Sequence, residues 1–125
     1  MEYVKYCSDE EVKRQVDIKG KCKLLKIYIS EDSMYKKHNL YHALVIKCKE
    51  LGLAGVTVTR GIEGYGKNKR LQSAHILDLS ASLPIIIEAI DKPERIEAVI
   101  PAVRDMVNEG LVMVTDVDVV KYGKD

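Results

Sequence analysis

Phenylalanine and tryptophan are absent from this chain of 125 residues, and seven tyrosines supply all of its aromatic side chains. Long apolar runs are absent as well, since none approaches the ~18 residues of a membrane helix. The N-terminus also lacks the apolar core of a signal peptide, so we expect a cytoplasmic protein with no membrane insertion. Cysteine is scarce: Cys7, Cys22 and Cys48 form a widely spaced odd set, which is typical of free thiols in a reducing compartment.

A strong charge of either sign is also missing. Twenty Lys and Arg against nineteen Asp and Glu leave a net charge of +1, which argues against a dedicated nucleic-acid binder, because such proteins must neutralise phosphates. A composition of 46% hydrophobic and 31% charged residues excludes wholesale disorder, and the length fits one domain. Few Asn and Gln beside many Lys, Glu, Ile and Val indicate a thermophilic source.

Apolar periodicity divides the chain into a polar N-terminal extension over residues 1–21, with a capping box from Ser8 to Glu11, and a domain over 22–125. In chain order we expect a strand over 22–29, a helix over 39–51, a strand over 55–60, a loop over 61–83, a strand over 84–90, a helix from a cap at Asp91 to a stop at Gly110, and a strand over 111–122. Pro101 should kink the second helix, because proline removes a backbone donor.

This order of elements predicts an α+β fold. Two β-α-β units joined by a long loop form a ferredoxin-like βαββαβ sandwich, in which a four-stranded antiparallel sheet carries both helices on one face. The other face would still carry Val and Ile side chains. Exposed apolar surface costs roughly 25 cal/mol per Å², so the sequence predicts self-association through this second face.

The segment GVTVTRGIEGYG, residues 55–66, begins as a strand with alternating Val and Thr and ends in three glycines. A glycine-rich exit from a strand can leave backbone N–H groups free to bind an anion such as phosphate, and Arg60 stands where its guanidinium could reach the same anion. Lys67, Lys69 and Arg70 add positive charge without interleaved aromatics that would stack on nucleic-acid bases. The segment therefore predicts a binding site for a phosphate-bearing ligand.

Nothing in the sequence supports an enzyme. No Ser-His-Asp, Cys-His or metal-hydrolase constellation occurs. Asp116 and Asp118 share one face of a predicted strand, but they have no nearby histidine or nucleophile, and we expect both to be simply solvated.

The stretch GLAGVTVTRGIEGYGKNKR, with LPIIIEAIDKPERIEAVIPAV and the ending VDVVKYG, resembles the nitrogen-regulatory PII proteins over residues 22–123. Even closer is the PII-like subgroup, whose hallmark is Thr-Val-x-Arg-Gly-Ile-x-Gly-aromatic-Gly. The resemblance implies a non-catalytic homotrimer whose subunit clefts bind adenine nucleotides. It also implies that the long T-loop, here 61–83, reports or gates this binding and docks onto a protein target.

The nucleotide site implied by the resemblance comprises Thr57, Arg60, Gly61, Gly64, Tyr65, Gly66, Glu88, Ile90 and Lys121. In it, Thr57 would hydrogen-bond the adenine edge, and the backbone at Glu88 and Ile90 would lie near the base. Arg60 and the glycines would meet the phosphates. Lys121 would reach the phosphates from a neighbouring subunit.

One departure from the PII pattern bears on the choice of nucleotide. True PII proteins carry Thr-Gly-x-x-Gly-Asp-Gly between the second helix and the last strand, and this turn grips the β- and γ-phosphates. The present chain has only Asn108, Glu109 and Gly110 there, so we expect AMP or ADP rather than ATP. The loop also lacks the usual context of the modified tyrosine, and uridylylation is not assumed.

Two alternatives on the same fold stay open. His38 and His42 are four residues apart, a spacing that can bind zinc, and with Cys48 they would suit a divalent-metal-binding trimer resembling the cation-tolerance proteins. Arg60 would suit an acylphosphatase-like enzyme, which also needs an asparagine that this sequence does not place well.

Overall fold

The structure, a computed structural model, describes residues 18–74 and 82–124. The strands of the main sheet are β1 (Gly20–Ser30), β4 (Val56–Arg60), β7 (Pro84–Asp91) and β8 (Leu111–Val119), and the helices are α3 (Leu40–Glu50) and α4 (Pro93–Met106). These bounds are close to the predicted ones, except that β8 ends before Tyr122 and that the limits of α4 differ, as described below. The predicted capping box at Ser8 and Glu11 lies outside the described residues.

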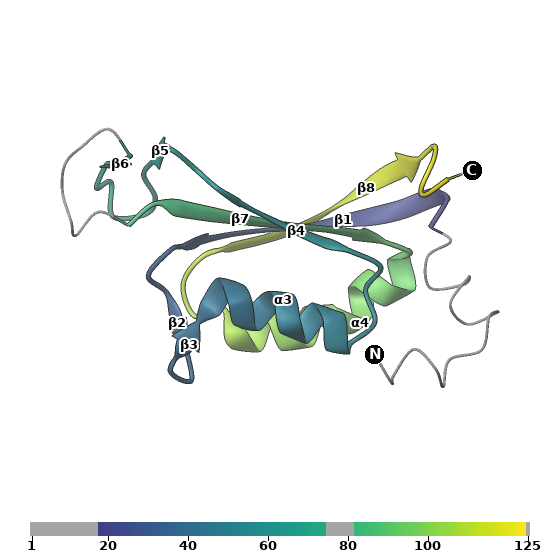
Figure 1. The fold of residues 1–125 in the computed structure, drawn as a ribbon, viewed down its shortest axis with the longest axis horizontal. Coiled ribbons are helices and arrows are strands. Elements are labelled where there is room, and N and C mark those ends of the chain that lie inside the picture. Colours follow the sequence, from purple (N-terminus) through teal and green to yellow (C-terminus); the bar gives the residue numbers. More distant parts are fainter. Residues whose placement is uncertain (1–17, 75–81, 125) are drawn as a thin grey trace.

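The main sheet has the order β4-β7-β1-β8, and all its neighbouring strands are antiparallel. Both helices lie on the same face of the sheet (Figure 1). This arrangement confirms the predicted ferredoxin-like sandwich. Among the residues that the structure describes, no helix covers the second face, and we call this second face the open face.

The hydrophobic core lies between the sheet and the two helices. Alternate side chains of β1 and β7 point toward the helices, because successive side chains of a strand point to opposite faces. The buried cluster comprises Leu25, Ile27, Ile29, Leu40, Leu44, Cys48, Leu53, Ile85, Ile87, Ala89, Ile96, Val99, Val103 and Met106. Leu51, although apolar, is 47% exposed, because it lies at the C-cap of α3, beyond the last buried turn.

The open face is formed by the side chains of β1, β7 and β8 that point away from the helices. Glu88 of β7 lies opposite Lys26 of β1, which in turn lies opposite Met113 of β8. The apolar side chains of this face are Leu24, Tyr28, Ile86, Ile90, Leu111 and Met113, of which Ile90, Leu111 and Met113 are exposed. The single chain therefore leaves an apolar surface in water.

A β-hairpin between β1 and α3 was not predicted. It consists of β2 (Met34–Tyr35) and β3 (His38–Asn39), and its two-residue turn has Lys36 at φ 47° and Lys37 at φ 71°. A turn with two left-handed residues usually contains Asn-Gly. Two lysines gave no such signal, and the sequence therefore did not reveal the hairpin.

The predicted limits of the second helix were wrong at both ends. The N-cap of α4 is Lys92 rather than Asp91, because Asp91 still belongs to β7. The helix continues through Pro101 and ends at Met106, well before Gly110. Gly110 instead permits a close approach of strands, since a Cβ there would lie 2.6 Å from the backbone oxygen of Tyr28.

Candidate functional site

The candidate site lies where β4 ends and the long loop begins. Within the described ranges, β4 is an edge strand of the main sheet and pairs with β7 alone. After Arg60 the chain forms β5 (Glu63–Gly64), which pairs with β6 (Gln72–Ser73). In Figure 1 these two short strands project beyond one end of the sheet. Residues 75–81 of the predicted loop are outside the described residues, and the ordering of that part of the loop stays a prediction.

Arg60 is held by an acidic residue that the sequence analysis did not single out. Its Nε lies 2.7 Å from Glu31 Oε2, and its Nη2 donates to Glu31 Oε1 at 3.1 Å. The hydrogen bond from Arg60 lowers the pKa of the Glu31 carboxyl below its ordinary value. The guanidinium predicted to bind an anion is thus already paired with one carboxylate of the chain itself.

Glu31 in turn ties the end of β1 to the end of the long loop. Its backbone N–H donates to the Leu83 oxygen at 2.9 Å, and the Leu83 N–H points to Glu31 Oε1 at 3.4 Å. Because Arg60 precedes the loop and Leu83 closes it, Glu31 holds both ends of the loop together.

A group of polar side chains continues this connection. The hydroxyls of Ser30 and Ser82 lie 2.6 Å apart, and the Ser82 N–H donates to Gln72 Oε1 at 2.9 Å. Asp32 accepts a hydrogen bond from the Ser30 hydroxyl at 2.8 Å, and its own N–H donates to the Ser82 hydroxyl at 3.1 Å. The base of the loop is therefore a connected polar network.

The glycines of the motif differ in what they do. The Gly61 N–H donates to the Pro84 oxygen at 2.7 Å, so in this conformation it is not free for a phosphate. A Cβ at Gly61 would lie 2.6 Å from Pro84 Cγ, and one at Gly64 would lie 3.4 Å from the same atom. Gly66 meets nothing within 4 Å. A Cβ at Gly64 would thus be in ordinary van der Waals contact, and Gly61 alone of the three glycines is required by the packing of Pro84.

Thr57 and Arg60 point to opposite faces of the sheet. Thr57 lies opposite Glu88 on the open face, whereas Arg60 lies opposite Ile85, whose side chain is buried under the helices. The open face also carries Ile90 and Lys26, whose Nζ lies 3.9 Å from Glu88 Oε2. A single ligand could contact both Thr57 and Arg60 only by crossing the exposed edge of β4.

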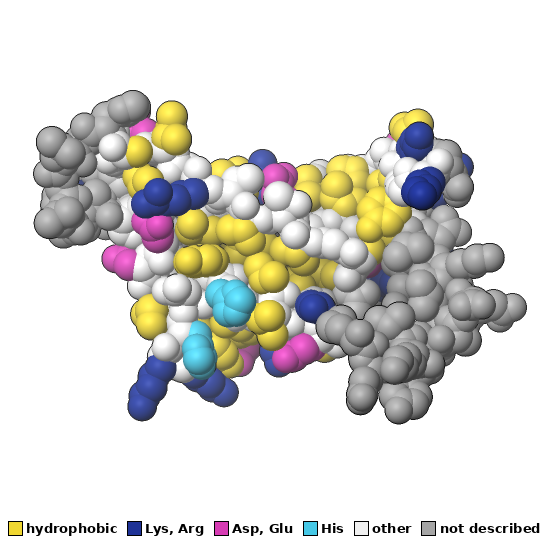
Figure 2. Space-filling view, in the orientation of Figure 1, with side chains coloured by type: hydrophobic (Ala, Val, Ile, Leu, Met, Phe, Trp, Pro, Cys, Tyr) yellow, Lys and Arg dark blue, Asp and Glu magenta, His cyan; other side chains and the backbone are white. Residues whose placement is uncertain are grey.

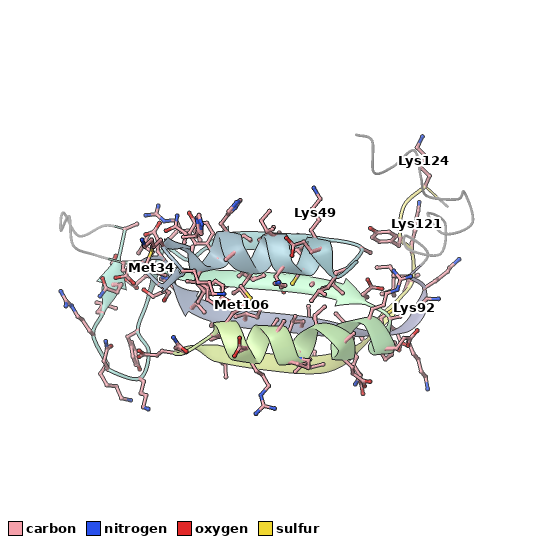
Figure 3. The ribbon with its side chains drawn as sticks, turned by 90° about the horizontal axis from the view of Figure 1, so that it is seen from below. Met34, Lys49, Lys92, Met106, Lys121 and Lys124 are labelled. Carbon is pink, nitrogen blue, oxygen red and sulfur yellow. The ribbon has the colours of Figure 1, made fainter. Side chains whose placement is uncertain are left out.

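Lys121 lies far from Arg60 within the chain. Figure 3 places Lys121, together with Lys92 and Lys124, at the end of the molecule opposite Met34. There the C-terminal segment folds back toward the start of β4, and the Tyr122 hydroxyl donates to the Ala54 oxygen at 3.5 Å. One chain therefore does not bring Lys121 to the loop base.

Tyr65 is exposed, and the Nζ of Lys69 lies 5.7 Å from its ring centroid. Lys69 itself has a left-handed φ of 62°. The pair stabilises a turn of the loop, in which the Lys69 N–H donates to the Gly66 oxygen at 2.9 Å. Tyr65 thus remains on the surface and accessible to a ligand or a partner.

The residues named for a metal site do not come together. His38 and His42 are both exposed, and cyan histidine side chains are visible on the face shown in Figure 2. Cys48, in contrast, is fully buried in the core. Burial raises the pKa of the Cys48 thiol, which disfavours the thiolate that a metal requires. Within 18–74 and 82–124, no three His, Cys, Asp or Glu side chains are grouped as metal ligands.

We expected Asp116 to be simply solvated, but in the structure it forms an ion pair. Its Oδ1 lies 2.9 Å from Lys23 Nζ, and this hydrogen bond lowers the pKa of Asp116. Asp118 is exposed. No helix in the described parts of the chain is long and apolar enough to cross a bilayer.

Comparison with known proteins gives the family. The model of the DUF190 family, described as "Uncharacterized ACR, COG1993", matches residues 22–119. A UPF0166 protein of Aquifex aeolicus is 39% identical over 100 residues, which are 80% of this chain and 94% of that protein. A UPF0166 protein of Methanocaldococcus jannaschii is 37% identical over 102 residues, which are 81% of this chain and 94% of that protein.

Solved structures share the fold. CPII of Thiomonas intermedia K12, a nitrogen regulatory PII-like protein, has been solved with ADP and bicarbonate, and with ADP, AMP and bicarbonate. The second of these structures aligns with a TM-score of 0.60 at 17% identity, over 81% of this chain and 90% of that one. The chain therefore belongs to the DUF190 (UPF0166) family, and its fold is that of the PII-like signalling proteins.

Proposed function

We propose that this protein is a non-catalytic regulator of the PII-like type that binds an adenine nucleotide, AMP or ADP in preference to ATP. One observation carries the proposal. An exposed edge strand, β4, bears Thr57 beside Glu88 at one end and Arg60 at the other, where the chain enters a glycine-containing loop. The nucleotides bound to CPII on the same fold support an adenine nucleotide as the ligand.

The site needs a second copy of the chain. Lys121 lies at the end of the subunit opposite the loop base, so it can reach a phosphate near Arg60 only from another subunit. The open face supplies an apolar surface through which copies can associate, because burying that surface is favourable. We therefore place each nucleotide in a cleft between subunits of a homotrimer, bordered by Thr57, Arg60 and the partner's C-terminal segment.

In this cleft the chain recognises the two ends of the nucleotide differently. The base lies along the open-face side of the β4 edge, near Thr57, Glu88 and Ile90. The phosphates meet Arg60, Gly64 and Gly66, with Tyr65 exposed beside them. Gly61 shapes the loop entry rather than donating to phosphate, because its N–H already binds Pro84.

The long loop is the element through which nucleotide binding would be read by a protein target. Its ends are held together by Glu31, Ser82 and their partners, so a ligand at Arg60 acts on the element that fixes the loop. Affinity capture of a target from cytoplasmic extract, with and without AMP, tests this part of the proposal. The metal-binding alternative has less support, since Cys48 is buried in the core whereas His38 and His42 are exposed.

Titration calorimetry with AMP, ADP, ATP and a cyclic adenine nucleotide tests the proposed function. We expect micromolar binding of AMP or ADP, about −8 kcal/mol, and a loss of at least tenfold in Arg60→Gln. Arg104→Gln is the matched control, because Arg104 is an exposed arginine in the last turn of α4. Absence of any binding below millimolar concentration would overturn the proposal.

A further inference from the structure

The pair of Glu31 and Arg60 bears on how much negative charge the phosphate site tolerates, and this inference rests on the function proposed above. A guanidinium has five N–H donors in a planar fork. Two of its nitrogens, Nε and Nη2, face the two oxygens of Glu31. Among the described residues, no other acceptor is hydrogen-bonded to Arg60, so its outer edge stays open to a ligand.

Glu31 cannot easily leave this position. Its backbone N–H is bonded to Leu83, and its Oε1 also lies within reach of the Leu83 N–H. Its side chain is less exposed than that of Arg60, at 31% against 59%. An anion that approaches Arg60 from solvent therefore meets a guanidinium whose charge is already balanced, with a fixed carboxylate behind it.

We infer that Glu31 determines the charge preference of the nucleotide site, favouring a monophosphate over a triphosphate. The ion pair has no net charge, so each phosphate added to the ligand gains little attraction from Arg60. Each added phosphate also increases the repulsion from Glu31, because like charges a few ångströms apart repel at the moderate effective dielectric of a protein surface. Glu31 also competes directly with the phosphates for the N–H donors of Arg60, and this competition likewise weakens the attraction that the site offers to added phosphates.

The absence of a second glycine-rich turn before β8 already predicted AMP or ADP from what the chain lacks. Glu31 provides a separate cause from what the chain contains. The two causes are separable by mutation, because Glu31 can lose its charge without any change at Asn108 to Gly110.

The experiment measures the dissociation constants of AMP, ADP and ATP for the full chain by calorimetry, without magnesium and at one ionic strength. In Glu31→Gln we expect the ratio of the ATP to the AMP constant to fall about tenfold, with ADP intermediate. Glu31→Asp keeps the charge and should keep the wild-type ratio. Circular dichroism of each variant checks that it is folded.

Two further variants separate the Glu31–Arg60 pair from general charge. Asp32→Asn removes the same charge from the next residue, which is bonded to Ser30 and Ser82 rather than to Arg60, and it should shift the ratio less than threefold. In an Arg60→Gln background, Glu31→Gln should still lower the ratio, because the carboxylate repels each added phosphate whether or not it is paired. The shift should be smaller than in the wild-type background, because competition for the guanidinium no longer exists.

The outcomes distinguish this inference from the function it rests on. A wild-type chain that binds none of the three nucleotides overturns the proposed function itself. Nucleotide binding with the same ATP to AMP ratio in Glu31→Gln overturns only the role of Glu31. The role of its charge is equally overturned if Glu31→Asp behaves like Glu31→Gln, or if Asp32→Asn shifts the ratio as much.

Discussion

Gly61 and Pro84 are joined by a backbone hydrogen bond of 2.7 Å, at the point where β4 leaves the sheet beside the start of β7. A Cβ on Gly61 would lie 2.6 Å from the ring carbon Pro84 Cγ and 3.4 Å from the Pro84 oxygen. A proline ring has little freedom to move aside. The first glycine of the motif is thus explained by packing.

This relationship predicts different effects for two glycines of one motif. Gly61→Ala should lower the free energy of unfolding by about 1–3 kcal/mol, as overpacking does elsewhere. Gly66→Ala should change it by less than ~0.5 kcal/mol, because nothing lies within 4 Å of the added carbon. Denaturant unfolding of the ligand-free proteins measures both. Equal losses of unfolding free energy in the two variants would show that the contact with Pro84 is not the cause of the destabilisation in Gly61→Ala.

Asp91 joins the end of β7 to the start of β4. Its side chain is fully buried and accepts hydrogen bonds from the Ala54 N–H at 2.8 Å and the Lys92 N–H at 2.7 Å. Asp91→Ala leaves these donors without their acceptor, and we expect a loss of about 2–4 kcal/mol in the free energy of unfolding.

The control for Asp91 is Asp105→Ala, an exposed aspartate of α4. It removes the same charge, and we expect a change within about 0.5 kcal/mol. Thermal unfolding of the two variants under identical conditions gives the comparison. A difference of less than 1 kcal/mol would mean that the bonds of Asp91 are replaced by water.

The Glu31 pair predicts a pH dependence of stability. The hydrogen bond from Arg60 holds the pKa of Glu31 below its ordinary value of 4.5. A carboxyl whose pKa is lower in the folded state stabilises the protein above its unfolded pKa, and this contribution is lost as the pH falls through the folded value.

The difference in unfolding free energy between wild type and Glu31→Gln should therefore be constant above about pH 5 and shrink below pH 4.5. Its size should be at most ~1 kcal/mol, because both side chains are partly exposed. Asp116, whose pKa Lys23 also lowers, is present in both proteins, so its contribution cancels. A difference that grows on acidification would contradict the assigned pairing.

The two described cysteines should be unreactive in the native protein. Cys22 and Cys48 are both buried, and burial raises the pKa of each thiol. We expect a thiol reagent at pH 7.5 to modify them only when the chain unfolds, as followed by peptide mass spectrometry. Rapid native labelling of Cys48 would reopen the metal-binding alternative.

The proposed homotrimer depends on the open face. Met113→Lys places a charge on that face, where Met113 of the edge strand β8 is exposed, and should raise the dissociation constant of the trimer at least tenfold. Met34→Lys is the control, because Met34 is also exposed but lies in the β2–β3 hairpin. Light scattering across a dilution series reports the oligomeric state, and a wild-type chain that is monomeric at micromolar concentration would remove the intersubunit site.

The sequence by itself determined the order of the elements and the fold, because strand and helix periodicities are local and strong. The apolar run PIIIEAI and the three-and-four spacing in α3 assigned β7 and most of the core correctly. The end of α4 and the β2–β3 hairpin were missed, because Met106 and the Lys36–Lys37 turn carry no local signal for a stop or a turn.

Tertiary structure alone decided what surrounds Arg60. Glu31 is 29 positions away in the chain, and it reaches Arg60 only because β7 lies between β1 and β4 and the long loop returns to Leu83 beside it. Strand alternation could assign Thr57 and Arg60 to opposite faces. It could not predict which side chains from distant parts of the sequence would lie beside each of them. Pairings across the sheet depend on strand order and register, which the folded chain determines as a whole.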